Sequence, residues 1–437
     1  MTSSARSMAS RGIPWLVISG VLVAALSLRG PIVAPTPVLR DIERDLGIGS
    51  ASVGLLTTAP VLMFALLTPV AAVMIRRSGA ERALLLSLSG VLVGTVIRAL
   101  PGFGWMLTGM VVIGAAITLG NVVIPVIIRR DVPGSRVGII TAAYVATLNA
   151  GSLLTSLLTA PLADIVGWSW ALLLWGVITI VGLFLWGIYL REISARGDIS
   201  GERYSGSLPS EATNQGIDPA TVTGPLPVMT KSRSVFRNPT AWLLLATFSC
   251  QTTIYYAFST WLPSITSDEL GLSRVGAGAL SSLFQGMGIL GAFVVPLLGR
   301  FAPRWVPASV ICVCWLLLTG GMLALPELTW LWLIFGAIAH SGGFVVIFTV
   351  LVAVSRSDTE AAGMSAFVQG GGYAVGALGA PLVGALHEAT GNWAAGELLL
   401  VVLAALYAFA LLAALLSAAR RGRAHGRTSF SSAKGHR

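Results

Sequence analysis

Stretches of about 20 apolar residues recur along nearly the whole chain and are separated by short polar turns. An apolar run of this length crosses the hydrocarbon core of a bilayer as a helix. The pattern predicts twelve spans, at residues 13–37, 51–75, 82–100, 104–128, 137–162, 168–190, 239–264, 274–299, 306–324, 328–352, 361–386 and 395–419. The predicted fold class is therefore an all-α polytopic membrane protein.

One long hydrophilic stretch, residues 192–237, interrupts this pattern. It is rich in Ser, Gly, Thr, Pro and charge and has no apolar periodicity, which predicts a flexible linker. We expect it to join a six-helix bundle at residues 1–191 to a second one at 238–419. A basic tail, residues 420–437, follows.

The two predicted bundles share short sequence matches in the same order. The matching pairs are Leu46-Gly47-Ile48 with Leu270-Gly271-Leu272, Gly114-Ala115 with Gly336-Ala337, and Ala160-Pro161-Leu162 with Ala380-Pro381-Leu382. Their shifts of 224, 222 and 220 positions are nearly equal. Because six spans separate the copies, both halves are predicted to have the same orientation in the membrane.

The composition agrees with a membrane protein. The chain is 55% hydrophobic and 11% charged, with mean hydropathy +0.83, whereas soluble domains carry about 25% charged residues. With a cytoplasmic N-terminus, 23 of the 28 Lys and Arg residues lie on the cytoplasmic side. This positive-inside bias accounts for the net charge of +10 without a nucleic-acid partner. It predicts a bacterial-type inner-membrane protein with the linker and both termini in the cytoplasm.

Arg29 is the charge that most restricts the function. It lies in the first span, between Pro14 and Pro37, where no other charged residue occurs. A guanidinium stays protonated, and a permanent charge at membrane depth by default marks a pathway. The alternative is a structural arginine that is paired or that snorkels to the membrane surface. No span has an acid at its centre, and Glu397 lies near the outer end of the twelfth span. We therefore expect the only fixed buried charge to be positive.

Several short motifs carry a resemblance to a known family. In the first half they are Leu28-Arg29 with Pro31 and Pro37, Asp45-Leu46-Gly47, Leu55 to Pro60, Asn121 with Pro125, Arg129 to Pro133, and Tyr144. In the second half they are Gln251, Tyr255 or Tyr256, Trp261-Leu262-Pro263, and Gln285. Through them the chain resembles the cyanate and nitroimidazole permeases of the major facilitator superfamily. The resemblance implies a transporter, not an enzyme, with substrate bound at mid-membrane between two parallel six-helix halves.

The resemblance also implies that spans one, four, seven and ten line the central cavity. The polar residues of these spans and their neighbours are the candidate substrate-binding residues: Arg29, Asn121, Tyr144, Asn149, Gln251, Tyr255, Tyr256, Gln285, His340 and Gln369. His340 is also a candidate for a coupling proton, because its side chain titrates near neutral pH. The alternatives are a neutral histidine bonded within the protein and, for Asn121, a hydrogen bond between helices.

The charge of Arg29 favours an anion or a small, planar, acceptor-rich substrate, since a guanidinium offers a fork of donors to oxygen atoms. We therefore predict a secondary active or facilitative transporter for a cyanate-like or nitroimidazole-like molecule. A proton-linked multidrug exporter and a non-transporting membrane sensor are the alternatives. We expect no cofactor and no metal, and a monomer in the lipid bilayer.

Three smaller expectations concern packing. Trp261, near the end of a span, is predicted to be an anchor at the membrane interface. The small residues from Gly376 to Gly384 predict close helix packing. The three cysteines, Cys250, Cys312 and Cys314, lie inside apolar runs and are predicted to be small buried side chains.

Overall fold

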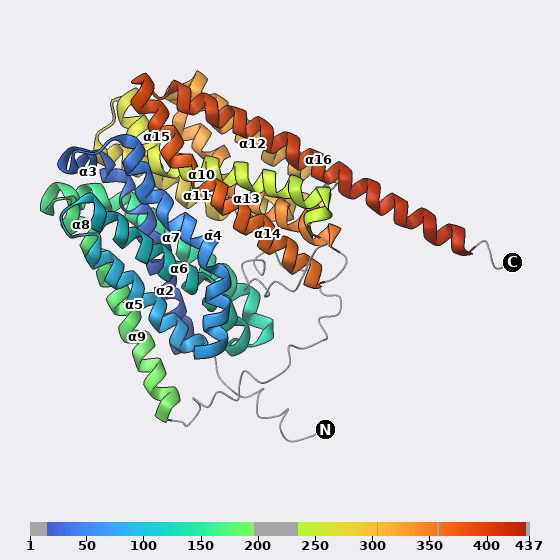
Figure 1. Ribbon diagram of the computed structural model, residues 1–437, viewed down its shortest axis with the longest axis horizontal. Coiled ribbons are helices and arrows are strands. Elements are labelled where there is room, and N and C mark those ends of the chain that lie inside the picture. Colours follow the sequence, from blue (N-terminus) through green and yellow to red (C-terminus); the bar gives the residue numbers. More distant parts are fainter. Residues whose placement is uncertain (1–14, 196–234, 304, 356–357, 434–437) are drawn as a thin grey trace. The chain divides into compact units, whose positions relative to one another are not determined.

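The computed structural model describes residues 15–195, 235–303, 305–355 and 358–433, and the secondary structure in these ranges is helical (Figure 1). Most of the predicted linker and the last residues of the predicted tail lie outside them. Contacts divide the chain into unit 1, which comprises Met1–Pro35 and Leu67–Pro225, and unit 2, which comprises Thr36–Leu66 and Leu226–Arg437. The domain boundaries predicted above stay a prediction, and the contacts group Thr36–Leu66 with the second half.

Unit 1 is built around α2, which packs against α6, α7 and α9. Its helices are α2 (Trp15–Val33), α5 (Ala80–Ile97), α6 (Phe103–Asp131), α7 (Gly134–Val166), α8 (Trp168–Leu174) and α9 (Gly176–Ala195). A long helix, α4 (Ser50–Ser78), begins in unit 2 and ends in unit 1.

Unit 2 is built around α10, which contacts α11, α13, α14, α15 and α16. Besides the first part of α4, its elements are η1 (Thr36–Val38), α3 (Leu39–Leu46), η4 (Val235–Arg237), α10 (Pro239–Leu270), α11 (Arg274–Phe301), α12 (Trp305–Ala324), η5 (Pro326–Leu328), α13 (Thr329–Val354), α14 (Asp358–Gly376), α15 (Gly379–Thr390) and α16 (Ala394–Ala433).

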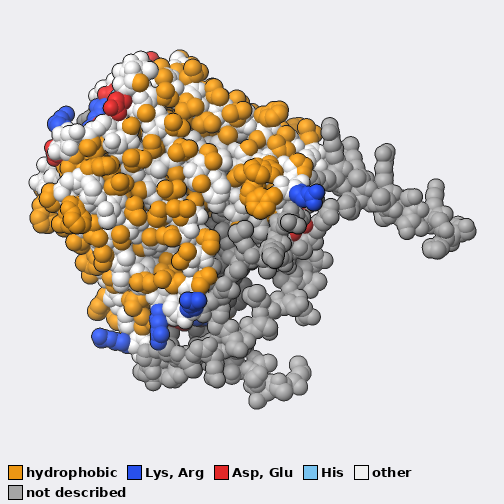
Figure 2. Space-filling model, viewed as in Figure 1, with side chains coloured by type: hydrophobic (Ala, Val, Ile, Leu, Met, Phe, Trp, Pro, Cys, Tyr) orange, Lys and Arg blue, Asp and Glu red, His pale blue; other side chains and the backbone are white. Residues whose placement is uncertain are grey.

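Eleven helical segments in the described part of the chain are long and apolar enough to cross a membrane. The one predicted span that is outside this set is the seventh, 239–264, which corresponds to α10. The middle of this helix is rich in Thr, Ser, Gln and Tyr. Most of these polar side chains are buried inside unit 2, where they avoid lipid. Figure 2 shows hydrophobic side chains over most of the visible surface, with charged side chains gathered at its edges. The all-α polytopic class is thus confirmed, with α10 as its polar member.

The repeat predicted from the sequence has a structural counterpart. Gly47 ends α3 at φ 61°, and Gly271 ends α10 at φ 64°, so both take the left-handed conformation that closes a helix. The two positions are 224 residues apart, which is the shift of the sequence match. A side chain with a Cβ is disfavoured in this conformation, which explains glycine at both sites.

The interface-anchor prediction for Trp261 is wrong. Its side chain is 1% exposed, and Nε1 donates to the carbonyl oxygen of Ala380 at 2.8 Å. A Cβ on Gly384 would lie 2.7 Å from the indole ring, so this glycine provides the space for the ring between α10 and α15. The predicted close packing of the small residues is confirmed here, and also at Gly379, whose added Cβ would lie 2.5 Å from the Thr253 carbonyl oxygen. The three cysteines are buried and free, as predicted.

Candidate functional site

Unit 1 brings three of the predicted substrate-binding residues together. Arg29 on α2 donates from Nη1 to Oδ1 of Asn149 on α7 at 3.2 Å. Tyr144, on the same helix as Asn149, lies close enough to interact electrostatically with the guanidinium. Tyr144 and Asn149 are 2% and 8% exposed, whereas Arg29 is half-buried. Because Asn149 is neutral, it orients the guanidinium without cancelling its charge.

Asn121 is not part of this hydrogen-bonded group. It is half-buried on α6, beside Gly120, where an added Cβ would lie 2.8 Å from the side chain of Leu28. The helix carrying Asn121 therefore packs closely on the helix carrying Arg29, and the two residues belong to adjacent elements of unit 1. Its role in binding stays a prediction.

Arg98 corrects the expectation that Arg29 is the only fixed buried charge. It follows α5, and its side chain is 0% exposed. Nη1 donates to the Pro31 carbonyl oxygen at 2.6 Å, and Nη2 donates to the Leu172 carbonyl oxygen at 3.0 Å. Pro35 lacks the N–H that would otherwise bond the Pro31 carbonyl, so Arg98 supplies the missing donor. The sequence signal for this contact is Pro35, four positions after Pro31, together with an arginine at the end of another span.

Unit 2 gathers a second group of predicted residues around Tyr255 on α10. The Tyr255 ring stacks on the His340 imidazole of α13, with ring centroids 3.7 Å apart and planes 11° apart. The Tyr255 hydroxyl donates to Oε1 of Gln285 on α11 at 3.2 Å. Gln251 donates from Nε2 to the backbone oxygen of His340 at 3.3 Å. Three helices thus hold one aromatic and amide group, and the Gln251 Oε1 atom in it is buried with no hydrogen-bond donor among the described residues.

The remaining two candidates in unit 2 differ from each other. Tyr256 is half-buried and contacts Tyr255 edge to face, with centroids 5.1 Å apart, so it adjoins the aromatic group. Gln369 on α14 donates to the hydroxyl of Ser365, one turn earlier on its own helix, at 2.8 Å. Tyr256 therefore belongs with the group around Tyr255, whereas the contact of Gln369 is within its own helix.

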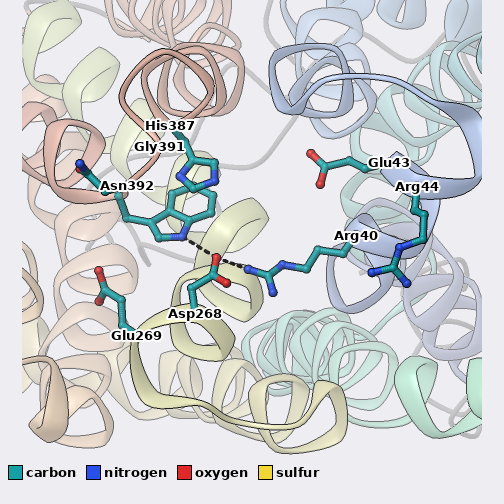
Figure 3. A pocket seen from close by; sticks show the side chains of 9 residues that line it. Arg40, Glu43, Arg44, Asp268, Glu269, His387, Gly391 and Asn392 are labelled. Carbon is teal, nitrogen blue, oxygen red and sulfur yellow. Dashed lines mark hydrogen bonds and ion pairs between the residues drawn. The ribbon is translucent and has the colours of Figure 1, made fainter.

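A separate polar cavity of about 790 Å³ lies in unit 2 at the ends of α3, α10 and α15 (Figure 3). It is lined by Arg40, Glu43, Arg44, Asp268, Glu269, His387, Gly391, Asn392 and Trp393. Asp268 accepts from Trp393 Nε1 at 2.9 Å and forms an ion pair with Arg40, and both contacts are drawn in Figure 3. Sequence reasoning missed this cavity, because its residues come from segments that are distant along the chain.

Two ion pairs join α3 to the end of α10 and the start of α11. Arg40 pairs with Asp268, and Arg274 pairs with Asp41. The two pairs have opposite polarity, because α3 contributes the cation to one and the anion to the other. All four side chains are partly exposed, so water screens both pairs and each contributes only about 0–1 kcal/mol. They set the position of α3 more than they stabilise the fold.

Comparison with known proteins places the chain in a family. The chain matches the family model of the Major Facilitator Superfamily over residues 17–356. It is 32% identical over 384 residues to a 2-nitroimidazole transporter of Escherichia coli K12, covering 86% of this chain and 90% of that protein. A cyanate transport protein of the same strain, CynX, is 25% identical over 377 residues, covering 85% of this chain and 90% of that protein. An uncharacterized transporter of Bacillus subtilis, YycB, is 28% identical over 392 residues, covering 89% and 90%.

Solved structures show the same fold. A bacterial homologue of the human lysosomal transporter Spinster, in an inward-facing and unoccupied conformation, matches with a TM-score of 0.66 at 16% identity. The match covers 93% of this chain and 99% of that one. From the family match and the relatives together, the chain belongs to the Major Facilitator Superfamily and is a multi-pass membrane transporter.

Proposed function

We propose that this transporter moves a small anion or a small, planar, acceptor-rich molecule, of the cyanate or nitroimidazole kind, by alternating access. Arg29 binds the acceptor atoms of the substrate, and Asn149 holds the guanidinium in position. Transporters built from parallel repeats bind substrate near the membrane midplane, where the repeats meet. On this basis the group around Tyr255 supplies further contacts, and Asn121, Tyr144 and Gln369 are secondary candidates.

The hydrogen bond between Arg29 and Asn149 is the observation that supports this proposal most. It orients the guanidinium through a neutral side chain, and a guanidinium attracts the acceptor atoms of an anion at short range. The guanidinium is half-buried, which strengthens that attraction relative to water. The names of two relatives, a 2-nitroimidazole transporter and a cyanate transport protein, agree with a small acceptor-rich substrate.

A thermal-shift panel on the purified protein tests the substrate class. Cyanate, nitrate, small carboxylates, nitroimidazoles and lipophilic cations are compared at matched ionic strength. A ligand that binds only the folded state stabilises it by about 2.7 kcal/mol at 100 times its Kd, so true ligands raise Tm measurably. We expect a small anion or nitroimidazole to raise Tm and lipophilic cations to leave it unchanged.

The variant Arg29→Gln identifies the binding group within this panel. It should lose the ligand-induced shift and keep its unliganded Tm close to the wild-type value. Arg300→Gln removes the same charge from an exposed position at the end of α11, so it should retain the shift. Normal binding by Arg29→Gln would mean that Arg29 is structural.

The other two hypotheses predict different results in the same system. Stabilisation by lipophilic cations alone would favour a proton-linked multidrug exporter. Binding of an anion without flux in reconstituted vesicles would favour a sensor. Flux of the stabilising ligand, lost in Arg29→Gln and kept in Arg300→Gln, is the result expected of the transporter.

A further inference from the structure

Glu397 is a buried carboxyl group that the proposed substrate site does not use. It lies in the first turns of α16, and its side chain is 4% exposed. Its Oε1 atom is buried and receives no hydrogen bond from the described residues. Among those residues, no ion pair includes its carboxyl group either. Its backbone N–H donates to the carbonyl oxygen of Trp393, which lines the polar cavity, at 2.9 Å.

Burial without a partner disfavours the charged form of a carboxyl group. The N-terminal end of a helix favours a negative charge, but this effect is weaker than the loss of hydration on full burial. The environment of Glu397 therefore favours its neutral, protonated form. A protonated carboxyl group that can lose its proton is a binding site for one proton.

Glu269 gives this site a connection to water. It lies at the end of α10, beyond the predicted span 239–264, and it lines the cavity with an exposed side chain. Glu269 also interacts electrostatically with Glu397, and two like charges at close range disfavour ionisation of both. Burial and then the charge of Asp268 raise the pKa of Glu269 above its ordinary value.

The other titratable groups near α16 come from the helices packed against it. At the cavity end these are Asp268 on α10 and His387 on α15, whose ring stacks on Trp393 with centroids 3.7 Å apart. On α12, Cys312 interacts with Tyr407, which is ten positions further along α16. On α13, His340 stacks on Tyr255. Among the described residues, no Lys or Arg forms an ion pair with Glu269 or Glu397.

We propose that Glu397 and Glu269 form a proton-binding pair, with Glu269 exchanging protons with the cavity and Glu397 holding one buried proton. Binding adds one proton to a carboxylate oxygen, and release returns it to water through the cavity. Ionised Glu397 would oppose the ionisation of Glu269, which in turn interacts with the charge of Asp268. Because Asp268 holds both Arg40 and Trp393, proton binding favours the packing of α3 and α16 on α10 seen in this structure.

The site makes the proton a candidate coupling ion for transport. Only this coupling role rests on the proposed function. The distribution of basic residues predicts that this end of unit 2 faces the outside. A proton from the external medium would then stabilise one conformation of the cycle. His340, the coupling candidate from the sequence, lies in the group around Tyr255 and is a separate hypothesis.

The existence of the proton site is tested without any substrate. A folded state that binds more protons than the unfolded chain loses stability as pH rises, so the wild-type Tm should fall between about pH 5 and about pH 8. One such proton corresponds to a fall of about 2–5 °C per pH unit. Glu397→Gln mimics the protonated form and should flatten this slope. Glu327→Gln, at an exposed position in η5, should keep it.

Infrared spectroscopy of the wild-type protein gives a second readout that needs no variant to fold. A carbonyl band of a protonated carboxyl group should persist at neutral pH and disappear at higher pH. Equal pH slopes in wild type and Glu397→Gln, or absence of this band at neutral pH, would overturn the proposal. So would loss of the slope in Glu269→Gln but not in Glu397→Gln, because the site would then be Glu269 alone.

Flux measurements then test coupling separately. With a ligand from the panel, wild-type flux should depend on external pH, and Glu397→Gln should lose most of that dependence. If no panel ligand is transported, the stability and infrared results still decide whether the proton site exists. If the proton site is confirmed but flux is independent of pH in both proteins, its coupling role is overturned.

Discussion

The two arginines inside unit 1 have the same charge and opposite surroundings. Arg98 is fully buried, and its guanidinium donates to two backbone carbonyl oxygens at helix ends. Arg29 is half-buried, and it donates to the side chain of Asn149. The first arginine satisfies backbone acceptors that the fold itself leaves open, while the second bonds to a side chain and remains partly exposed. Burial alone therefore does not identify a binding arginine, and the type of partner is more informative.

The largest effect is expected from Arg98→Ala. Removal of the guanidinium leaves the Pro31 and Leu172 carbonyl oxygens without their donor, at about 1–3 kcal/mol for each buried group. We expect a large loss of Tm and a low yield of folded protein. Unfolding in detergent, followed by tryptophan fluorescence, measures this loss. If Arg98→Ala were as stable as wild type and bound substrate poorly, the assignment of roles to the two arginines would be reversed.

The next effect is expected in substrate affinity. Hydrogen bonds to a charged group contribute about 1.5–3 kcal/mol, so Arg29→Gln should weaken binding by about 10- to 150-fold. Asn149→Ala should weaken it less, because the charge remains and only its orientation is lost. Affinities of the wild type, the two single variants and the double variant, measured by titration, form a double-mutant cycle. Strict additivity would show that Asn149 does not act through Arg29.

A smaller effect is expected in unit 2. Tyr255→Phe keeps the ring that stacks on His340 and removes the hydroxyl that donates to Gln285. One neutral hydrogen bond contributes about 0.5–1.5 kcal/mol, so affinity should fall about two- to tenfold. Tyr256→Phe, at the adjoining ring of the same group, is compared with it and should lose less affinity. An equal loss in both variants would argue against a special position for Tyr255.

The smallest effect is expected at the ion pairs of α3. Replacing Asp41 by Asn should change stability by less than about 1 kcal/mol, because its pair with Arg274 is partly exposed. Exchange of the two charges, Asp41→Arg with Arg274→Asp, should restore flux if the single variants reduce it. The double exchange is measured in vesicles beside each single variant. A loss of stability comparable to that of Arg98→Ala would show that these pairs are not screened.

Sequence reasoning succeeded where the signal is a local property of the chain. The lengths of apolar runs predicted the spans, and the glycines of the repeat marked two equivalent helix ends, Gly47 and Gly271. The choice of polar residues inside spans also selected Arg29, Asn149, Tyr255 and His340, which the structure joins within their own units. A polar group inside an apolar run must find a partner, and this requirement is visible in the sequence.

It failed where the outcome depends on which helices meet. Trp261 has the usual sequence context of an interface anchor, but Gly384 on another helix makes room to bury it. Arg98 lies at a span end, and only the approach of α2 and α8 encloses it. The polar cavity likewise combines residues of α3, the end of α10 and the end of α15, which no local pattern connects.

The amino-acid pattern alone was sufficient for the membrane class, the helical spans, the repeat and the family resemblance, because apolar length and motif spacing are read along one segment at a time. Packing alone decided that residues 36–66 group with the second half, that Arg98 is fully buried, and that the carboxyl group of Glu397 is buried. These outcomes depend on contacts between distant segments, and the free energy of a buried charge is set by the neighbours that those contacts bring to it.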